Sequence, residues 1–194
     1  MTLPAIAPLR PIRSRTVPVG RDWIYELKLD GFRGMLRICD GCAQFTSKNS
    51  KPLRRFDDLA TSLARALRSR SAILDGEIIV MGDRGPDFKA LFFGRRPPAF
   101  AAFDLLWLNG RDLRPLPLWR RKIALRKLVT NTPIGYVDHV ADPMLFAAVS
   151  QHDLEGIVAK RRGDPYRIDI QWLKVKCAGY SQMAGRWELF ERRR

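Results

Sequence analysis

The 194-residue sequence has few cysteines, only two histidines and no long apolar run. No stretch approaches the roughly 20 apolar residues that span a bilayer, and prolines interrupt the short apolar N-terminus, so neither a membrane partner nor a secretory signal is expected. Cys39 and Cys42 flank a predicted hairpin turn, with no second cysteine pair or histidine pair nearby, which excludes a structural zinc site. Together with Cys177 they predict three free thiols, which suit a reducing cytoplasm.

The balance of charge is strongly basic. Lysine and arginine number 35 against 20 acidic residues, a formal net charge of +15. Such a surplus attracts polyanions and predicts salt-sensitive binding. A merely solvated basic surface accounts for the charge almost as well, so charge indicates a class of partner and not a chemistry.

Hydrophobic periodicity predicts more strands than helices. Strands are expected at residues 23–28, 72–80, 100–108, 156–160 and 172–176, with a hairpin joining 33–39 to 42–47 through Asp40-Gly41. Helices are expected at residues 56–69, 118–129 and 143–151. Many strands with three helices favour an α+β fold of largely antiparallel sheets. We expect an extended, proline-rich arm at 1–20, one domain at 21–180 and a tail at 181–194, frayed at its end.

The segment ELKLDGFR, residues 26–33, holds a candidate nucleophile. On a strand, Lys28 and Asp30 would share one face, while Leu27 and Leu29 would point into the core. To attack at neutral pH, Lys28 must lose a proton, which neighbouring positive charge and desolvation favour. Taken alone, this segment is explained more simply as an amphipathic strand with a surface ion pair.

Two further segments each offer one residue suited to binding a nucleoside. Glu77 lies in the apolar run LDGEIIV, where a buried carboxylate needs a metal, a cation or a hydroxyl such as that of a ribose. Its alternative is a structural ion pair with an arginine. Phe103 could stack on a purine, although core packing explains it equally simply.

The last two segments offer groups suited to a metal ion and phosphates. Glu155 precedes an apolar strand and is a candidate ligand for Mg²⁺, or else a surface charge. Lys174 and Lys176 share one strand face and repel each other unless an anion such as a phosphate chain lies between them. Their field would also lower the pKa of Lys28. The alternative is a solvated edge strand with protective lysines.

In their order over about 150 residues, these motifs resemble the covalent nucleotidyltransferase superfamily, which includes ATP-dependent DNA ligases, RNA ligases and mRNA capping enzymes. The resemblance covers about residues 20–178. The phrases FDLLWLNG (103–110), EGIVAK (155–160) and WLKVK (172–176) are most similar to the adenylation domain of bacterial end-joining-type ATP-dependent DNA ligases. This resemblance implies a core of two antiparallel sheets flanked by helices, an ATP-grasp-like arrangement.

The resemblance also implies a role for each motif. Lys28 would take AMP from ATP and pass it to the 5′-phosphate of nicked or broken double-stranded DNA. A 3′-hydroxyl would then displace AMP and seal the strand. The implied setting is DNA repair in the cytoplasm, at the nucleoid. The implied contacts are Glu26 and the backbone near Leu27 with the adenine, Phe103 stacked on it, Arg33 and Glu77 with the ribose, Asp30 and Glu155 with Mg²⁺ or Mn²⁺, and Lys174 and Lys176 with the phosphates.

Three features depart from the family pattern. Lys48 stands where the family usually has an arginine that binds the nick phosphate, which keeps the charge but loses the bidentate fork. Arg167-Ile168 follows Tyr166 in place of the usual Gly-Arg. The residues after Lys176 are too few for a five-stranded OB barrel, so we expect no OB domain here and a partner that supplies one, such as an end-joining repair protein. A nucleotide- or DNA-binding scaffold without turnover, or an RNA ligase or capping-type enzyme, remains the alternative.

Overall fold

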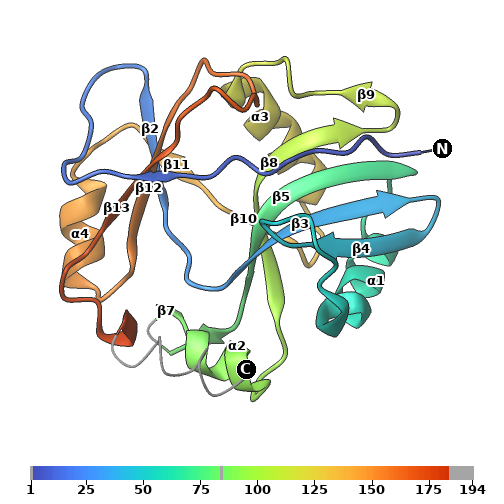
Figure 1. The fold of residues 1–194 in the computed structure, drawn as a ribbon, viewed down its shortest axis with the longest axis horizontal. Coiled ribbons are helices and arrows are strands. Elements are labelled where there is room, and N and C mark those ends of the chain that lie inside the picture. Colours follow the sequence, from blue (N-terminus) through green and yellow to red (C-terminus); the bar gives the residue numbers. More distant parts are fainter. Residues whose placement is uncertain (1, 84, 184–194) are drawn as a thin grey trace.

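Two β-sheets dominate residues 2–83 and 85–183, which are the residues that this computed structural model describes. The first sheet has the order β1 (Ile12–Arg13), β13 (Leu173–Lys176), β12 (Gly156–Arg161), β2 (Trp23–Leu27), β11 (His139–Val140). The second has the order β10 (Gly135–Tyr136), β8 (Ala99–Leu108), β5 (Ser71–Ile79), β3 (Phe32–Cys39), β4 (Cys42–Thr46), with β9 (Arg111–Asp112) beside β8. Figure 1 shows the first sheet on the left and the second on the right.

The described strand pairs are antiparallel except for β1 with β13 and β10 with β8. A separate small hairpin joins β6 (Met81–Gly82) to β7 (Gly85–Pro86). Four α-helices flank the sheets: α1 (Asp57–Ala66), α2 (Phe88–Phe93), α3 (Leu118–Val129) and α4 (Leu145–Gln151). Two short 3-10 helices lie at Arg54–Phe56 and Ser181–Met183. The predicted α+β class is confirmed.

The long predicted elements are found close to their predicted bounds, and the hairpin turn has the expected chemistry. Asp40 and Gly41 take φ values of 47° and 83°, and Cys39 pairs directly with Cys42. Helix α2 was not predicted. It begins after Asp87, whose side chain accepts a hydrogen bond from the Ala90 amide at 2.8 Å, and ends at Gly94 in the left-handed region.

The N-terminal arm adds a strand to the first sheet and packs apolar side chains against the second. Ile6 and Leu9 are buried, and β1 pairs in parallel with β13. Strand β13 is therefore an interior strand, so the edge-strand interpretation of its lysines is wrong. The division into an arm, a domain and a tail stays a prediction, and most of the predicted tail, residues 184–194, lies outside the described residues.

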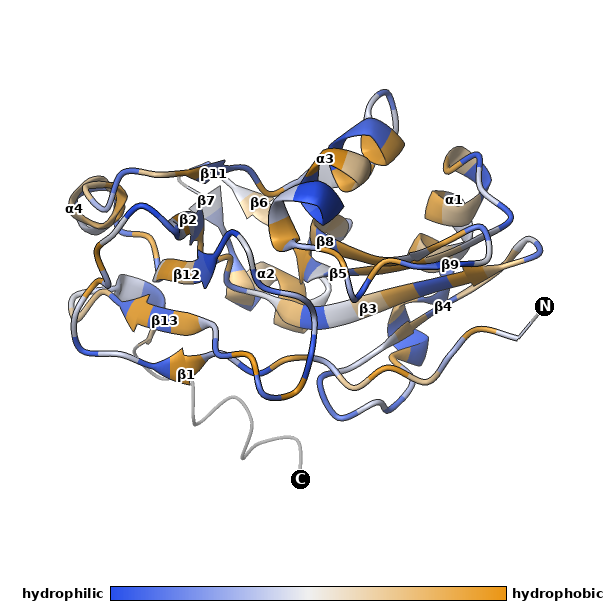
Figure 2. Cartoon of the chain, turned by 90° about the horizontal axis from the view of Figure 1, so that it is seen from above, coloured by the Kyte–Doolittle hydropathy of each residue, from blue (hydrophilic) through white to orange (hydrophobic). Residues whose placement is uncertain are grey.

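Apolar side chains fill the space between the second sheet and its helices. Helix α1 packs on β4, α3 on β8 and α4 on β12. Figure 2 shows hydrophobic colours along much of the strands and hydrophilic colours in many of the connecting loops. Among the described helices, none combines the length and the apolar character that crossing a bilayer requires.

Two glycines near Lys28 allow neighbouring backbone segments to approach each other closely. A Cβ on Gly31 would lie 2.1 Å from the Ile78 carbonyl oxygen, and one on Gly156, whose φ is +145°, would lie 2.1 Å from the Val175 carbonyl oxygen. The Gly156 carbonyl also accepts a hydrogen bond from the Lys28 amide at 2.9 Å. The backbone of Lys28 is thus held against the residue that follows Glu155.

Candidate active site

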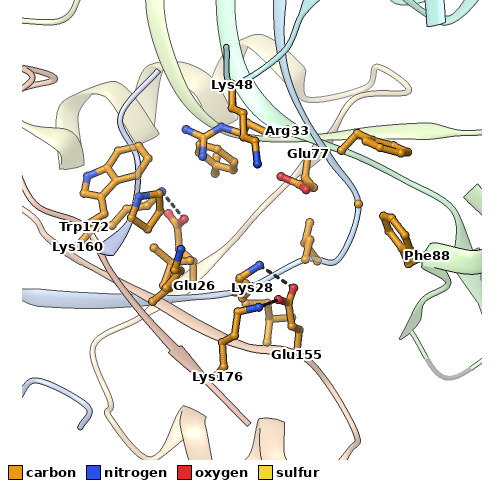
Figure 3. Close-up of a pocket in the computed structure, with 18 of the residues that line it drawn as sticks. Glu26, Lys28, Arg33, Lys48, Glu77, Phe88, Glu155, Lys160, Trp172 and Lys176 are labelled. Atoms are coloured by element: carbon orange, nitrogen blue, oxygen red, sulfur yellow. Dashed lines mark hydrogen bonds and ion pairs between the residues drawn. The ribbon is translucent and has the colours of Figure 1, made fainter. Parts of the chain in front are cut away.

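A cavity of about 730 Å³ lies between the two sheets. Side chains from β2, β3, β5, β8, β12 and β13 line it, and Figure 3 shows many of them pointing into it. Sequence-predicted site residues from distant parts of the chain meet here. Those that line the cavity are Glu26, Leu27, Lys28, Arg33, Lys48, Glu77, Phe103, Glu155, Lys174 and Lys176.

Glu155 joins two of the cavity lysines. Its two carboxylate oxygens lie 2.6 Å from the Lys28 Nζ and 2.7 Å from the Lys176 Nζ (Figure 3). Burial alone would raise the pKa of Glu155, but the attraction of Lys28 and the hydrogen bonds from both lysines lower it below its ordinary value. Glu155 is therefore an ionised carboxylate that holds Lys28 and Lys176 side by side.

Lys174 adds a third cation to this group. Its ammonium has no hydrogen-bond or ion-pair partner among the described residues, and its pKa is lowered by burial and by the charges of Lys28 and Lys176. Three ammonium groups around one carboxylate make this end of the cavity electropositive. A bound polyphosphate would relieve the repulsion between the lysines.

Glu77 opens onto the cavity and has no hydrogen-bond or ion-pair partner in the part of the chain that the structure describes. Its predicted alternative, an ion pair with an arginine, is wrong for the described residues, because Arg33 bonds Asp75 instead through two contacts of 2.6 Å. Burial raises the pKa of Glu77 to about 7, against the opposing effects of Lys28 and Arg33. The half-buried carboxylate is thus available to a ligand hydroxyl.

We expect Glu77→Gln to change how stability depends on pH. Because the folded pKa of Glu77 is raised, the folded chain keeps this proton between about pH 4.5 and 7 while the unfolded chain has lost it, so stability falls as pH rises through that window. Because glutamine does not ionise, the variant does not lose stability in this way as pH rises. In urea titrations it should gain about 1–3 kcal/mol relative to the wild type between pH 4.5 and 8. A difference that stays constant over this range would contradict the prediction.

Glu26 lies at the other end of the cavity in a buried ion-pair cluster. Its oxygens lie 2.5 Å from the Lys122 Nζ and 2.5 Å from the Lys160 Nζ. Burial alone would raise the pKa of Glu26, and the two lysines lower it below its ordinary value. Lys122 also donates a hydrogen bond to the Val137 carbonyl at 2.9 Å. Glu26 is therefore held rigidly at the cavity wall.

Aromatic rings form the wall next to this cluster. Phe103 meets Trp172 edge-to-face, with ring centroids 5.9 Å apart. The Arg33 guanidinium lies 4.5 Å and the Lys160 Nζ 4.3 Å from the Phe103 ring centre. This is a flat, cation-lined wall that suits an aromatic base.

Two predictions about the first motif are wrong in geometry. Strand β2 ends at Leu27, so Lys28 and Asp30 do not share a strand face. Leu27 is 39% exposed and lines the cavity, where the core was expected. Asp30 is buried, accepts a hydrogen bond from the Tyr180 hydroxyl at 2.9 Å and is not among the residues that line the cavity.

Several cavity residues escaped the sequence analysis. Lys160 and Trp172 stand inside the phrases EGIVAK and WLKVK, but their own roles were not considered. Phe88 comes from the unpredicted helix α2. Lys122 does not itself line the cavity but pairs with Glu26, which does; its helix is predicted only to be basic, and its burial depends on Glu26, 96 residues earlier.

Two sheets around an electropositive cavity with a lysine at its floor define a nucleotidyltransferase-type ligase domain. The family model described as "ATP dependent DNA ligase domain" matches residues 9–176, and the chain belongs to this family. The resemblance inferred from the motifs is thereby confirmed.

The chain resembles bacterial end-joining ligases in sequence. It is 36% identical over 174 residues to the multifunctional non-homologous end joining protein LigD of Pseudomonas aeruginosa, covering 82% of this chain and 21% of that protein. It is 29% identical over 194 residues to DNA ligase C of Mycobacterium tuberculosis, covering 87% and 54%. The chain thus spans about a fifth to a half of the length of these relatives.

The fold agrees with solved ligase structures. The crystal structure of the ligase domain of M. tuberculosis LigD matches with a TM-score of 0.70 and 27% identity, covering 87% of this chain and 59% of that one. A mycobacterial DNA ligase D complexed with ATP and MES matches with a TM-score of 0.70 and 28% identity, covering 87% and 60%.

Proposed function

We propose that this chain is the adenylation core of an ATP-dependent DNA ligase, in which Lys28 takes AMP from ATP for DNA strand joining. One observation carries the proposal: the Lys28 ammonium lies at the floor of a cavity beside Glu155, Lys176 and Lys174, and Lys174 has no partner within residues 2–83 and 85–183. Membership of the ligase family supports it, as does the ATP-bound state of the mycobacterial neighbour.

The two ends of the cavity suit the two ends of ATP. At the aromatic end, Phe103 stacks on the adenine, and Glu26 and the backbone at Leu27 contact the edge of the adenine ring. Arg33 and Glu77 face the ribose. The Glu77 carboxylate, which has no partner among the described residues, accepts a hydrogen bond from a ribose hydroxyl. At the basic end, Lys174 and Lys176 neutralise the phosphates.

The first step is a displacement at phosphorus. The Lys28 ammonium first releases one proton to solvent. The neutral Nζ then forms a bond to the α-phosphorus, the bond from that phosphorus to the bridging oxygen breaks, pyrophosphate leaves, and Nζ releases its second proton to solvent. Positioning supplies much of the rate in such a reaction. The hydrogen bond from the Lys28 amide to Gly156 and the ion pair to Glu155 provide that positioning.

At the basic end of the cavity, the protein offers only part of a ligand set for a divalent cation, Mg²⁺ or Mn²⁺. Glu155 offers hard carboxylate oxygens, whereas no cluster of three or more histidine, cysteine or acidic residues gathers within residues 2–83 and 85–183. Such an ion, held by Glu155 and by phosphate oxygens of the substrate, would supply charge neutralisation at the phosphates. Asp30 is not among the lining residues and accepts a hydrogen bond from Tyr180, so it is not proposed as a ligand.

DNA is the proposed acceptor. The relatives are named as end-joining proteins and DNA ligases, and Lys48, exposed at the cavity rim, is suited to a DNA phosphate. Completing the sealing step with an OB domain or an end-joining partner, in the cytoplasm at the nucleoid, is part of the same proposal.

The test is covalent labelling with ATP. We expect wild-type protein incubated with α-labelled ATP and Mg²⁺ to retain label after denaturation, and to lose it in acid because the phosphoramidate bond is acid-labile. Unlabelled ATP should compete and GTP should not. Absence of label at any ATP concentration, also with an OB domain supplied, would leave only a binding scaffold, and competition by GTP would favour a capping-type enzyme.

A further inference from the structure

Helix α2 connects the active-site cavity to a separate surface. Phe88, at the start of α2, lines the cavity, and its ring lies 5.9 Å from that of Phe92. Phe92 meets Phe93 edge-on at 5.3 Å, and Phe93 is 50% exposed. The six residues of α2 span about 9 Å at 1.5 Å per residue, so an exposed aromatic ring stands a short distance from the proposed ATP site.

The surface beside Phe93 is a basic hollow. It has a volume of about 430 Å³ and is lined by Arg55, Arg95 and Arg96 together with Pro97 and other residues, and none of its described lining residues is acidic. The Arg55 guanidinium is fixed by the α2 C-terminus, since it donates a hydrogen bond to the Leu91 carbonyl at 2.7 Å. The hollow therefore has a rigid floor and a net positive charge.

The two exposed arginines are available to an anion. Within the described residues Arg95 has no acidic partner, and its guanidinium lies 5.1 Å from the Phe93 ring centre. Arg96 donates a hydrogen bond to the Met81 carbonyl at 3.4 Å, and its acidic partner among the described residues is Asp83, at 4.0 Å, with both of these side chains largely exposed. So weak a surface pair holds little of the charge of Arg96.

We propose that Phe93, Arg95 and Arg96 bind a single-stranded stretch of DNA next to the end that occupies the active site. An exposed ring with an adjacent arginine is suited to stacking an unpaired base, and the arginines neutralise the backbone phosphates. Duplex DNA, whose bases are already stacked on one another, would use the arginines but not the ring. The proposal rests on the proposed action on DNA and adds a preference for ends with unpaired nucleotides.

The test measures binding of a labelled single strand of about 12 nucleotides, a length typical of single-strand sites, and of a duplex of equal length, by fluorescence anisotropy. We expect Phe93→Ala to weaken single-strand binding at least about 5-fold while changing duplex binding less than about 2-fold. Arg95→Glu/Arg96→Glu should weaken both at least about 10-fold. Phe93→Leu, which keeps an apolar side chain without a ring, should behave like Phe93→Ala.

The matched control reverses two exposed charges on α3, at the opposite end of the molecule in Figure 1, as Arg120→Glu/Lys127→Glu. It should weaken binding less than about 3-fold. Equal losses in the two charge reversals, or no change in Phe93→Ala, would overturn the proposal. Lysyl-AMP labelling of the same preparations needs no DNA, so it should be equal in all of them. A wild type that binds as expected but takes no label would refute the proposed function and leave the binding site standing.

Discussion

Lys28→Arg should abolish covalent labelling by ATP, with a loss of at least about 10³-fold. Arginine keeps the positive charge and can still pair with Glu155, so the fold and the electrostatics of the cavity should survive. A guanidinium stays protonated in proteins and offers no lone pair to phosphorus. The measurement is the amount of α-label retained after denaturation, with thermal melting to confirm that the variant is folded.

Lys176→Arg is the matched control, because Lys176 bonds the other oxygen of the same carboxylate and its side chain is 26% exposed against 21% for Lys28. This variant should label more slowly, as expected for a phosphate contact, but should still reach a covalent product. Peptide mapping should place the label on Lys28. Full labelling of Lys28→Arg, or label on Lys174 or Lys176, would refute the assignment of the nucleophile.

The strand pattern of this fold follows from local sequence. Continuous apolar runs identify β5, β8 and β12, alternation identifies β13, and the Asp40-Gly41 turn identifies the hairpin of β3 and β4. Short elements such as β9, β10 and β11 have two residues each and carry no periodicity to detect. Helix α2 has six residues that are mostly apolar, so its helical character depends on its two caps and on packing against the rest of the chain.

The site residues that belong to sequence motifs could be predicted. Alternation correctly predicted that Lys174 and Lys176 share a face, since both line the cavity while Val175 is buried. The end of β2 was not predictable, because a strand ends where its partner does: the last register pair is Leu27 with Ile157, from a strand 130 residues later. The partners of Arg33 were also undetermined, since Asp75 and Glu77 are both within reach of it on the neighbouring strand.

Long-range ion pairs are the part of the site that local sequence reveals least. Glu26, Lys122 and Lys160 come from β2, α3 and β12, and nothing in the individual segments indicates that the two lysines are buried. The cluster fixes the cavity wall, because Lys160 contacts the Phe103 and Trp172 rings as well as Glu26. The aromatic end of the cavity is therefore positioned by charges that its own motif does not contain.

Glu26→Gln should consequently destabilise the protein by about 3–5 kcal/mol, because it leaves two buried ammonium groups without their counter-charge. For a chain of this length that corresponds to a fall in melting temperature of roughly 6–20 °C. The attraction of the lysines lowers the pKa of Glu26, so the stabilisation is present above the ordinary carboxyl pKa and is lost as pH falls through the lowered value. The effect should therefore be measured by thermal melting near pH 7.

Two further variants separate a buried charge cluster from general sensitivity to substitution. Asp138→Asn breaks the exposed pair with Arg126 and should cost less than about 1 kcal/mol. Adding Lys160→Met to Glu26→Gln removes one of the stranded charges, so the double variant should melt above Glu26→Gln alone. A Glu26→Gln melting temperature equal to that of the wild type would show that Lys122 and Lys160 do not depend on this carboxylate, and the rigid wall inferred for the adenine end would then have to come from the aromatic packing alone.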